Sequence, residues 1–322
     1  MKFVVVGGSG FLGRRVCAAA AARGHTTLAT TTKPDPKPGS VRFDLAEDRS
    51  VTELLPPGYF DGPPVWAVVC SCTTPMDRCR TDWDYAYKVN VAHTTRLIDD
   101  VCLAGGRVVF ISTSFVFDGS SGYYAEDAPH APGSAYGEHK SIMDRYVNRA
   151  HPTSLVVRLD KIVGADPADQ HPFTEWWGLH RSGRPVVCIE NQIMSPTLVD
   201  DIAGGIVTAC EGGLVGTYHL TGSEFFLRDH LARHFFRVMG VDARVETRPL
   251  SAFRFADPRP LNTYLDSSRF AAATGYRFTP MSEIMRRFRT RTRIFSAGVG
   301  DRPTSPASAG ATERSRGEGS RR

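Results

Sequence analysis

The N-terminal segment constrains the fold more than any other part of the chain. The stretch "KFVVVGGSGFLGRR" (2–15) carries a short β-branched run directly into Gly7, Gly10 and Gly13, which open an Ala-rich helical stretch. A tight turn favours residues without Cβ, and the free N–H groups at a helix start attract an anion. The spacing therefore predicts a strand–turn–helix unit that holds the pyrophosphate of a dinucleotide. The alternative is a structural turn that binds no ligand.

The rest of the first 160 residues repeats this alternation of strand and helix. The apolar runs are continuous rather than alternating, as in strands that are covered on both faces. We expect strands at 2–7, 26–30, 65–71, 107–113 and 154–160, and helices at 11–23, 48–55, 82–104 and 135–150. This order predicts an α/β protein with a doubly wound parallel sheet, the Rossmann fold.

The pattern becomes less regular after residue 160. We predict a nucleotide-binding domain at 1–163 and a smaller, mainly substrate-binding C-terminal lobe at 164–290, with a strand near 216–221 returning to the first sheet. From residue 296 to 322 the chain is rich in Ser, Gly, Pro, Ala and Arg without periodicity, which predicts a disordered basic tail.

Charge and cysteine content narrow the function classes. The net charge is +5, but the segment from Arg286 to the end holds 10 Arg and 3 acidic residues, and the remainder holds 29 basic and 31 acidic residues. Because a nucleic-acid enzyme places its basic stripe on the fold, we expect no nucleic-acid partner. The seven cysteines lack paired metal-ligand spacing, so no metal is expected. No signal peptide or membrane-spanning run is visible, which indicates a cytoplasmic protein.

The end of the second strand bears on the choice of cofactor. An NAD site usually shows a carboxylate there, which binds the ribose hydroxyls. Here the strand ends in hydroxyls and a cation, including Thr31 and Lys33, and Arg14 follows the last glycine of the turn. These groups suit a 2′-phosphate, so NADP(H) is favoured, with NAD(H) as the alternative. The competing interpretation is that the cations are simply solvated.

The stretch "SAYGEHK" places Tyr136 four residues before Lys140, on one face of a predicted helix. The preceding strand ends at Ser112-Thr113-Ser114, at the edge where doubly wound sheets bind ligands. An ammonium beside a phenol lowers the pKa of the phenol from its ordinary value near ~10. Tyr136 could then exchange a proton with a carbonyl oxygen that Thr113 also holds, while Lys140 contacts the nicotinamide ribose.

Several ordered motifs resemble one family. "ISTSFVFDG" is similar to a stretch with Ser-Thr-Asp-Tyr-Val-Phe-Asp-Gly, and "YYAEDAPHAPGSAYGEHK" to its Tyr-x-Glu-x-Asp…Pro…Tyr-Gly-x-x-Lys continuation. "MSPTLVDDIA", "GTYHLTG" and "RPLNTYLDSSRF" resemble later segments in the same order. From residue 2 to about 280 the chain thus resembles the extended short-chain dehydrogenase/reductases, and more narrowly the dTDP-4-dehydrorhamnose reductases.

The resemblance implies roles for individual residues. It implies a catalytic set, a cofactor set and a substrate set. The catalytic set is Thr113, Tyr136 and Lys140. The cofactor set is Gly7, Gly10, Phe11, Leu12 and Gly13 at the pyrophosphate, Asp44 and Leu45 at the adenine, and Cys70, Ser71 and Cys72 at the nicotinamide. The substrate set is Ser114, Phe115, Ser195 and Arg259. It also implies that Asn90 bends a helix or supports the site. The implied reaction is NADP-dependent reduction of the 4-keto group of a nucleotide-linked (dTDP) 4-keto-6-deoxy sugar, in a protein that could form a homodimer.

Three departures from the family pattern leave alternatives open. The family usually shows Asn-Ala-Ala where this chain has Cys70-Ser71-Cys72, Asp in place of Ser114, and Arg-Thr-Ser-Trp at 158–161, where this chain has "RLDK". A catalytically silent NADP-binding regulatory subunit is one alternative, because fold alone does not fix function. Another is a reductase or epimerase that acts on a different substrate. Dehydration is disfavoured, because the Asp-Glu that sugar dehydratases carry after the catalytic Thr is replaced by Ser114-Phe115.

Overall fold

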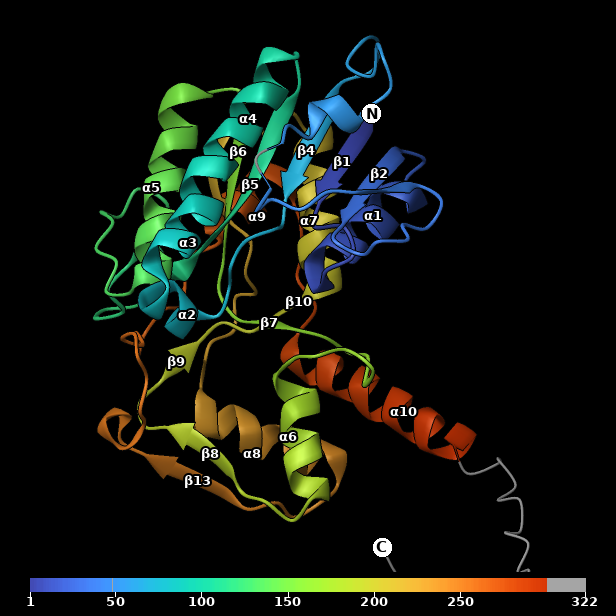
Figure 1. The fold of residues 1–322 in the computed structure, drawn as a ribbon. Helices are drawn as coiled ribbons and strands as arrows, with labels where there is room; N and C mark the ends of the chain where they lie inside the picture. The colour runs from blue at the N-terminus through green and yellow to red at the C-terminus, as the bar shows by residue number, and fades with distance from the viewer. Residues whose placement is uncertain (48, 300–322) are drawn as a thin grey trace, which may run out of the picture.

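The computed structural model describes residues 1–47 and 49–299 (Figure 1). A seven-stranded sheet, in the order β11-β6-β5-β4-β1-β2-β3, organises the larger part of the chain. Its strands are β1 (Lys2–Val6), β2 (Thr26–Thr31), β3 (Ser40–Arg42), β4 (Val65–Val69), β5 (Arg107–Thr113), β6 (Leu155–Leu159) and β11 (Gly216–His219). Every neighbouring pair is parallel. The predicted doubly wound Rossmann fold is confirmed.

Helices cover both faces of this sheet (Figure 1). Because side chains alternate along a strand, Val4 and Val6 pack under α4 (Thr94–Leu103) and α5 (Ala135–Ala150), on the opposite face from Phe3 and Val5. The second face is covered by α1 (Phe11–Ala22), α7 (Val199–Glu211) and α9 (Ser268–Thr274). Both faces are therefore buried, which explains the continuously apolar strands.

Two helix predictions are wrong in detail. The helix expected at 48–55 is only a 3₁₀ turn, η1 (Thr52–Leu54), because Leu55 is extended ahead of Pro56. The helix expected at 82–104 is divided into α3 (Trp83–Tyr87), the π-helical turn η2 (Lys88–His93) and α4, and it follows a further helix, α2 (Met76–Thr81). The short edge strand β3 was not expected either.

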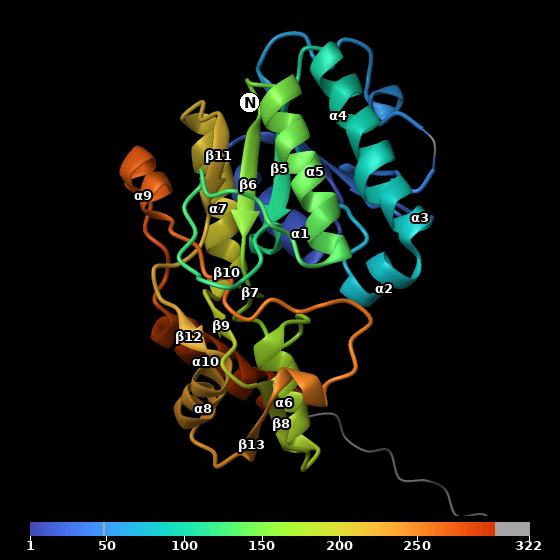
Figure 2. The same ribbon diagram turned by 90° about the vertical axis from the view of Figure 1, so that its left-hand side faces the viewer.

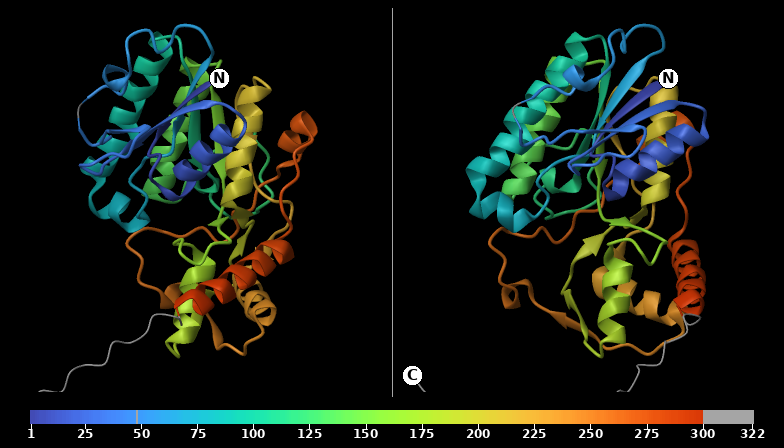
Figure 3. Two further views of the ribbon diagram at one scale, coloured as in Figure 1. Left: turned by 90° about the vertical axis from the view of Figure 1, so that its right-hand side faces the viewer. Right: turned by 45° about the vertical axis from the view of Figure 1, so that its right-hand side comes forward.

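A second lobe lies beyond the carboxyl ends of the sheet strands (Figures 2 and 3). Its helices are α6 (Pro172–Arg181), α8 (Arg228–Met239) and α10 (Met281–Val299), and its longest strand pair is β8 (Val186–Ile189) with β13 (Val245–Arg248). Two-residue strands pair as β7 (Ile162–Val163) with β10 (Thr197–Leu198) and β9 (Ile193–Met194) with β12 (Phe226–Leu227). Phe173 stacks on Phe235 at 4.9 Å in its aromatic core.

The chain passes between the two lobes more than once. Helix α7, strand β11 and helix α9 follow residue 164 yet pack on the large sheet, so the division at residue 163 stays a prediction. Helix α10 continues to Val299, beyond the predicted start of the tail at 296, and residues 300–322 of that tail lie outside the described residues. Within the described ranges, no helix has the length and apolar character to cross a membrane.

Candidate active site

The turn between β1 and α1 requires glycine at two positions. Gly7 has φ +82°, and a Cβ there would lie 2.4 Å from Ser71 Oγ. A Cβ on Gly13 would lie 2.2 Å from the carbonyl oxygen of Gly7. The chain reverses tightly here, with Gly10 N–H donating to Gly7 O at 3.0 Å, so that Phe11 and Leu12 form the first turn of α1. The turn and Ser71 therefore lie in direct contact, and their predicted roles toward the cofactor stay predictions.

A cavity of about 490 Å³ opens beside β2 and gathers three of the predicted cofactor residues, Arg14, Thr31 and Lys33. Lys37 also lines it and was missed, although the spacing of "KPDPK" places two lysines in one Pro-rich loop. Thr30, which also lines the cavity, holds the glycine turn in place: its Oγ1 accepts a hydrogen bond from Gly7 N–H at 2.9 Å. The cavity therefore presents hydroxyls and cations, which suit a phosphate, together with the carboxylate of Asp35.

Arg14 also has a protein partner that the sequence did not reveal. Its guanidinium pairs with Asp169, whose other carboxylate oxygen lies 2.9 Å from Arg15 Nη2. The Asp169 side chain is 4% exposed, while that of Arg14 is 42% exposed. The loop before α6 thus closes onto the start of α1, where His171 also stacks on Phe11 at 6.0 Å.

Asp44 and Leu45 lie outside this cavity. Asp44 Oδ1 accepts the Ala46 N–H at 2.9 Å, and Leu45 is buried in the core under α4. The Leu45 carbonyl oxygen lies 2.7 Å from His93 Nδ1. The predicted contact of these two residues with adenine stays a prediction.

The three predicted catalytic residues lie on adjoining elements. Tyr136 and Lys140 occupy the first turns of α5, and Thr113 ends β5. Lys140 Nζ donates to Ile111 O at 2.7 Å and lies 5.9 Å from the centroid of the Tyr136 ring. Helix α5 can lie close to the end of β5 because Gly137 has no Cβ. A Cβ at this position would lie only 2.1 Å from Phe115 O. The helix starts at Ser134, whose Oγ accepts the Gly137 N–H at 3.1 Å.

The pKa of Tyr136 differs from expectation. Burial raises the pKa of this phenol well above its ordinary value, and the neighbouring Cys72 and Cys79 thiols raise it further. The predicted lowering by Lys140 is therefore wrong for this structure, in which burial and the thiols dominate. A phenol of this kind stays protonated at neutral pH and can donate a proton.

The segment that follows β4 forms the neighbouring wall. Cys70 and Cys72 are partly buried, and burial raises the pKa of Cys70 to about 12. Asn90, in the π-helical turn, fixes this segment by accepting Thr73 N–H at 2.7 Å and donating to Thr73 O at 3.1 Å. Asn90 therefore supports the wall of the site through two hydrogen bonds to the backbone of Thr73. Among residues 1–47 and 49–299, no group of three or more His, Cys, Asp or Glu side chains could hold a metal ion.

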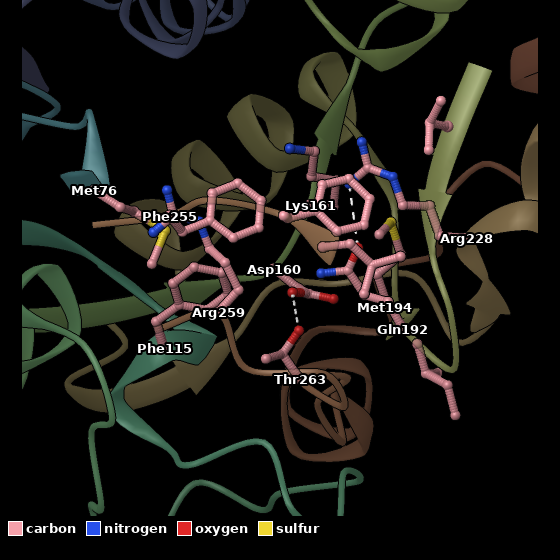
Figure 4. A pocket seen from close by; sticks show the side chains of 14 residues that line it. Met76, Phe115, Asp160, Lys161, Gln192, Met194, Arg228, Phe255, Arg259 and Thr263 are labelled. Atoms are coloured by element: carbon pink, nitrogen blue, oxygen red, sulfur yellow. Dashed lines mark hydrogen bonds between the residues drawn. The ribbon is translucent and has the colours of Figure 1, made fainter. Parts of the chain in front are cut away.

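A second cavity, of about 300 Å³, lies between the lobes (Figure 4). Phe115 and Arg259, two of the predicted substrate residues, line it, and the Phe115 ring centroid lies 6.4 Å from that of Tyr136. Ser114 and Ser195 are connected to it through hydrogen bonds to Asp160, a lining residue to which the sequence analysis gave no role. Ser114 Oγ donates to Asp160 Oδ1 at 2.9 Å, and Ser195 N–H donates to Oδ2 at 2.5 Å.

Other lining residues were missed because they come from separate parts of the chain. They are Met76, Asp160, Lys161, Val187, Ile189, Gln192, Ile193, Met194, Arg228, Phe253, Phe255 and Thr263. The only sequence signal was at Asp160 and Lys161, which stand where the chain departs from the family pattern. No local spacing could have joined Gln192 or Arg228 to them.

Comparison with known proteins identifies the family. Residues 1–293 match the RmlD substrate binding domain. The chain belongs to this family. It is 29% identical over 283 residues to a dTDP-4-dehydrorhamnose reductase of Streptomyces griseus, with 84% of this chain and 88% of that protein covered. It is 30% identical over 282 residues to a probable dTDP-4,6-dihydroxy-2-methyloxan-3-one 4-ketoreductase of Streptomyces antibioticus, with 84% and 88% covered.

A solved structure supports the fold assignment. The dTDP-4-dehydrorhamnose reductase of Bacillus anthracis, in complex with NADP, superposes with a TM-score of 0.77 at 21% identity and covers 89% of this chain and 98% of that one. At this level of identity the similarity establishes the shared architecture. Membership of the RmlD family agrees with the resemblance in the sequence motifs.

Proposed function

We propose that the protein is an NADPH-dependent reductase of the 4-keto group of a dTDP-linked 4-keto-6-deoxy sugar. The observation that carries the proposal is that the Tyr136 ring lies 5.9 Å from Lys140 Nζ and 6.4 Å from the ring of Phe115, which lines the inter-lobe cavity. In this proposal the carbonyl oxygen of the substrate binds next to the protonated phenol of Tyr136. The names of the two Streptomyces relatives, both reductases of dTDP-linked sugars, support the same class of substrate.

The reaction follows from the positions of these side chains. Reduced nicotinamide, when bound, supplies hydride to the carbonyl carbon. The Tyr136 hydroxyl gives its proton to the carbonyl oxygen, which becomes the product hydroxyl, and Thr113 Oγ orients that oxygen. Lys140, whose Nζ donates to Ile111 O at 2.7 Å, would contact the nicotinamide ribose, and solvent returns the proton to the Tyr136 phenolate.

The residues present fit a dinucleotide with a 2′-phosphate. The glycine turn leads directly into the start of a helix, whose free N–H groups attract an anion. Arg14, Lys33 and Lys37 line the adjoining cavity, and β2 ends without a carboxylate. The Bacillus anthracis neighbour is itself in complex with NADP. Cytoplasmic location and a homodimer stay predictions.

The direct test is the consumption of reduced nicotinamide by purified protein with a dTDP-4-keto-6-deoxyhexose, measured for NADPH and NADH separately. We expect turnover with NADPH that disappears in Tyr136→Phe. Tyr85→Phe, which alters a half-exposed tyrosine on α3, is the matched control and should keep full activity. NADPH binding without turnover of any keto sugar would instead indicate the silent regulatory alternative. Tightly retained cofactor with sugar interconversion would indicate an epimerase.

A further inference from the structure

Two cations line the inter-lobe cavity on the side away from the catalytic residues. Lys161 follows β6, and Arg228 is the first residue of α8. Figure 4 shows Arg228 beside Gln192, on the opposite side of the cavity from Met76 and Phe115. The Phe115 side adjoins Tyr136, so the two cations belong to the part of the cavity distant from the chemistry.

Neither cation is neutralised by the protein. Within the described residues, Lys161 and Arg228 form no ion pair, and the one hydrogen bond of the Arg228 guanidinium to an oxygen goes from Nη1 to Gln192 Oε1 at 3.2 Å. Arg228 Nε is buried without a hydrogen-bond partner, although the guanidinium also interacts with the Cys188 thiol. An unpartnered buried donor on a charged group is costly, so this nitrogen indicates a missing acceptor.

The placement of the two charges is itself unfavourable. Burial lowers the pKa of Lys161, and the nearby Arg228 charge lowers it further. Arg228 also begins a helix, where the positive end of the helix dipole opposes a cation. An anion bound between the two side chains would offset all of these costs.

The nearby carboxylates do not fill this role. Both oxygens of Asp160 are occupied, by Ser114 and Thr263 hydroxyls at 2.9 Å and by the Ser195 N–H at 2.5 Å. Glu175 attracts Lys161 and lines a neighbouring cavity together with it, but the two form no ion pair among the described residues. The cation pair therefore has no ion-pair partner in the described part of the chain and remains available to a ligand.

We propose that Lys161 and Arg228 form the subsite that binds the diphosphate of the nucleotide sugar. The inference rests on the proposed function for the identity of the substrate. With the reacting carbonyl placed beside Phe115 and Tyr136, the phosphate-bearing end of the sugar extends toward the opposite side of the cavity. A diphosphate offers several acceptor oxygens and a charge that two cations can match.

Calorimetric titration of the full chain with dTDP tests this subsite without requiring turnover. We expect Lys161→Gln and Arg228→Gln each to raise the Kd of dTDP about tenfold, as the loss of a hydrogen bond to a charged group implies. The double variant should bind weaker still, and Lys161→Arg should keep most of the affinity. Thymidine, which lacks the diphosphate, should bind all variants equally. Arg233→Gln, five residues further along α8 and outside this cavity, is the matched control.

The outcomes separate this inference from the proposed function. Selective loss of dTDP affinity in the variants, with no keto sugar reduced by the wild type, would support the subsite and reject the reductase. Reduction with an unchanged dTDP Kd in the double variant, or no dTDP binding by the wild type, would overturn the subsite. If the variants lost affinity only for a nucleotide-linked uronate, the cations would bind a sugar carboxylate and the diphosphate assignment would be wrong. Unfolding midpoints equal to that of the wild type establish that the variants fold.

Discussion

Arg15 Nη2 lies 2.9 Å from Asp169 Oδ2, and this contact joins the start of α1 to the loop before α6, more than 150 residues later in the chain. Arg14 pairs with the other oxygen of the same carboxylate. A single buried carboxylate thus holds two consecutive arginines beside the glycine turn. The contact makes the cofactor end of the site depend on a residue of the second lobe.

Removing the Asp169 charge should destabilise the protein. Asp169→Asn weakens two charge-assisted hydrogen bonds to partly exposed arginines, and we expect a loss of about 1–2 kcal/mol in the free energy of unfolding. Urea denaturation measures it. Asp200→Asn is the control, because Asp200 is 46% exposed and lies 3.4 Å from Arg15 Nε, so its loss should cost less than about 0.5 kcal/mol. Equal effects of the two variants would show that the contact with Asp169 adds no stability.

The lysines of the 490 Å³ cavity should determine cofactor preference. Lys33→Gln or Lys37→Gln removes one cation from the predicted 2′-phosphate position, and each should raise the Kd of NADPH by about 3- to 10-fold while leaving that of NADH unchanged. Fluorescence titration at low salt measures both, because salt weakens such exposed contacts. Lys88→Gln, on η2 outside this cavity, is the control. Parallel losses for NADPH and NADH would place the lysines elsewhere than at the 2′-phosphate.

Local patterns were enough to predict those parts of the site that lie within one strand–turn–helix unit. The glycine turn and the Tyr136–Lys140 pair depend on spacings of three and four residues, and α5 was predicted with its correct bounds, 135–150. The partners Asp169 and Arg228 could not be predicted in this way. Each contacts the site through tertiary folding, and nothing in the flanking residues marks that contact.

The same distinction holds for the fold. The β-branched runs gave the central strands, because burial on both faces requires continuous apolar sequence. Strand β3, at the sheet edge, carries no such run, and η2 became a π-helical turn in which Asn90 bonds to Thr73. The pairing of an edge strand determines β3, and a side-chain contact across the fold accompanies η2. The pattern of apolar residues along the chain predicts neither element.

The stability of the protein should respond to pH through Asp160. Burial raises the pKa of this carboxyl from 3.8 to about 6, so the folded protein binds the proton more tightly than the unfolded chain does. The stabilisation of the folded state by this proton is then fully present below the pKa that Asp160 has in the unfolded chain, and it is lost as pH rises through about 6. Relative to Asp160→Asn, the wild type should be more stable at about pH 4.5 than at about pH 7.5 in urea denaturation. A stability difference that is independent of pH would show that Asp160 ionises normally.

The pH dependence of reduction should report the phenol of Tyr136. Because burial and the Cys72 and Cys79 thiols raise its pKa, the proton donor persists through neutral pH, and kcat/KM should stay high until the pH exceeds the ordinary pKa of a phenol. Cys72→Ala removes one of these causes and restores the residue usual in the family, so the alkaline limb of the profile should move to lower pH. Cys102→Ala, beside Ser154 and away from the tyrosine, should leave the profile unchanged. A wild-type limb near about pH 8, or no movement in Cys72→Ala, would mean that Lys140 rather than the buried surroundings governs the phenol during turnover.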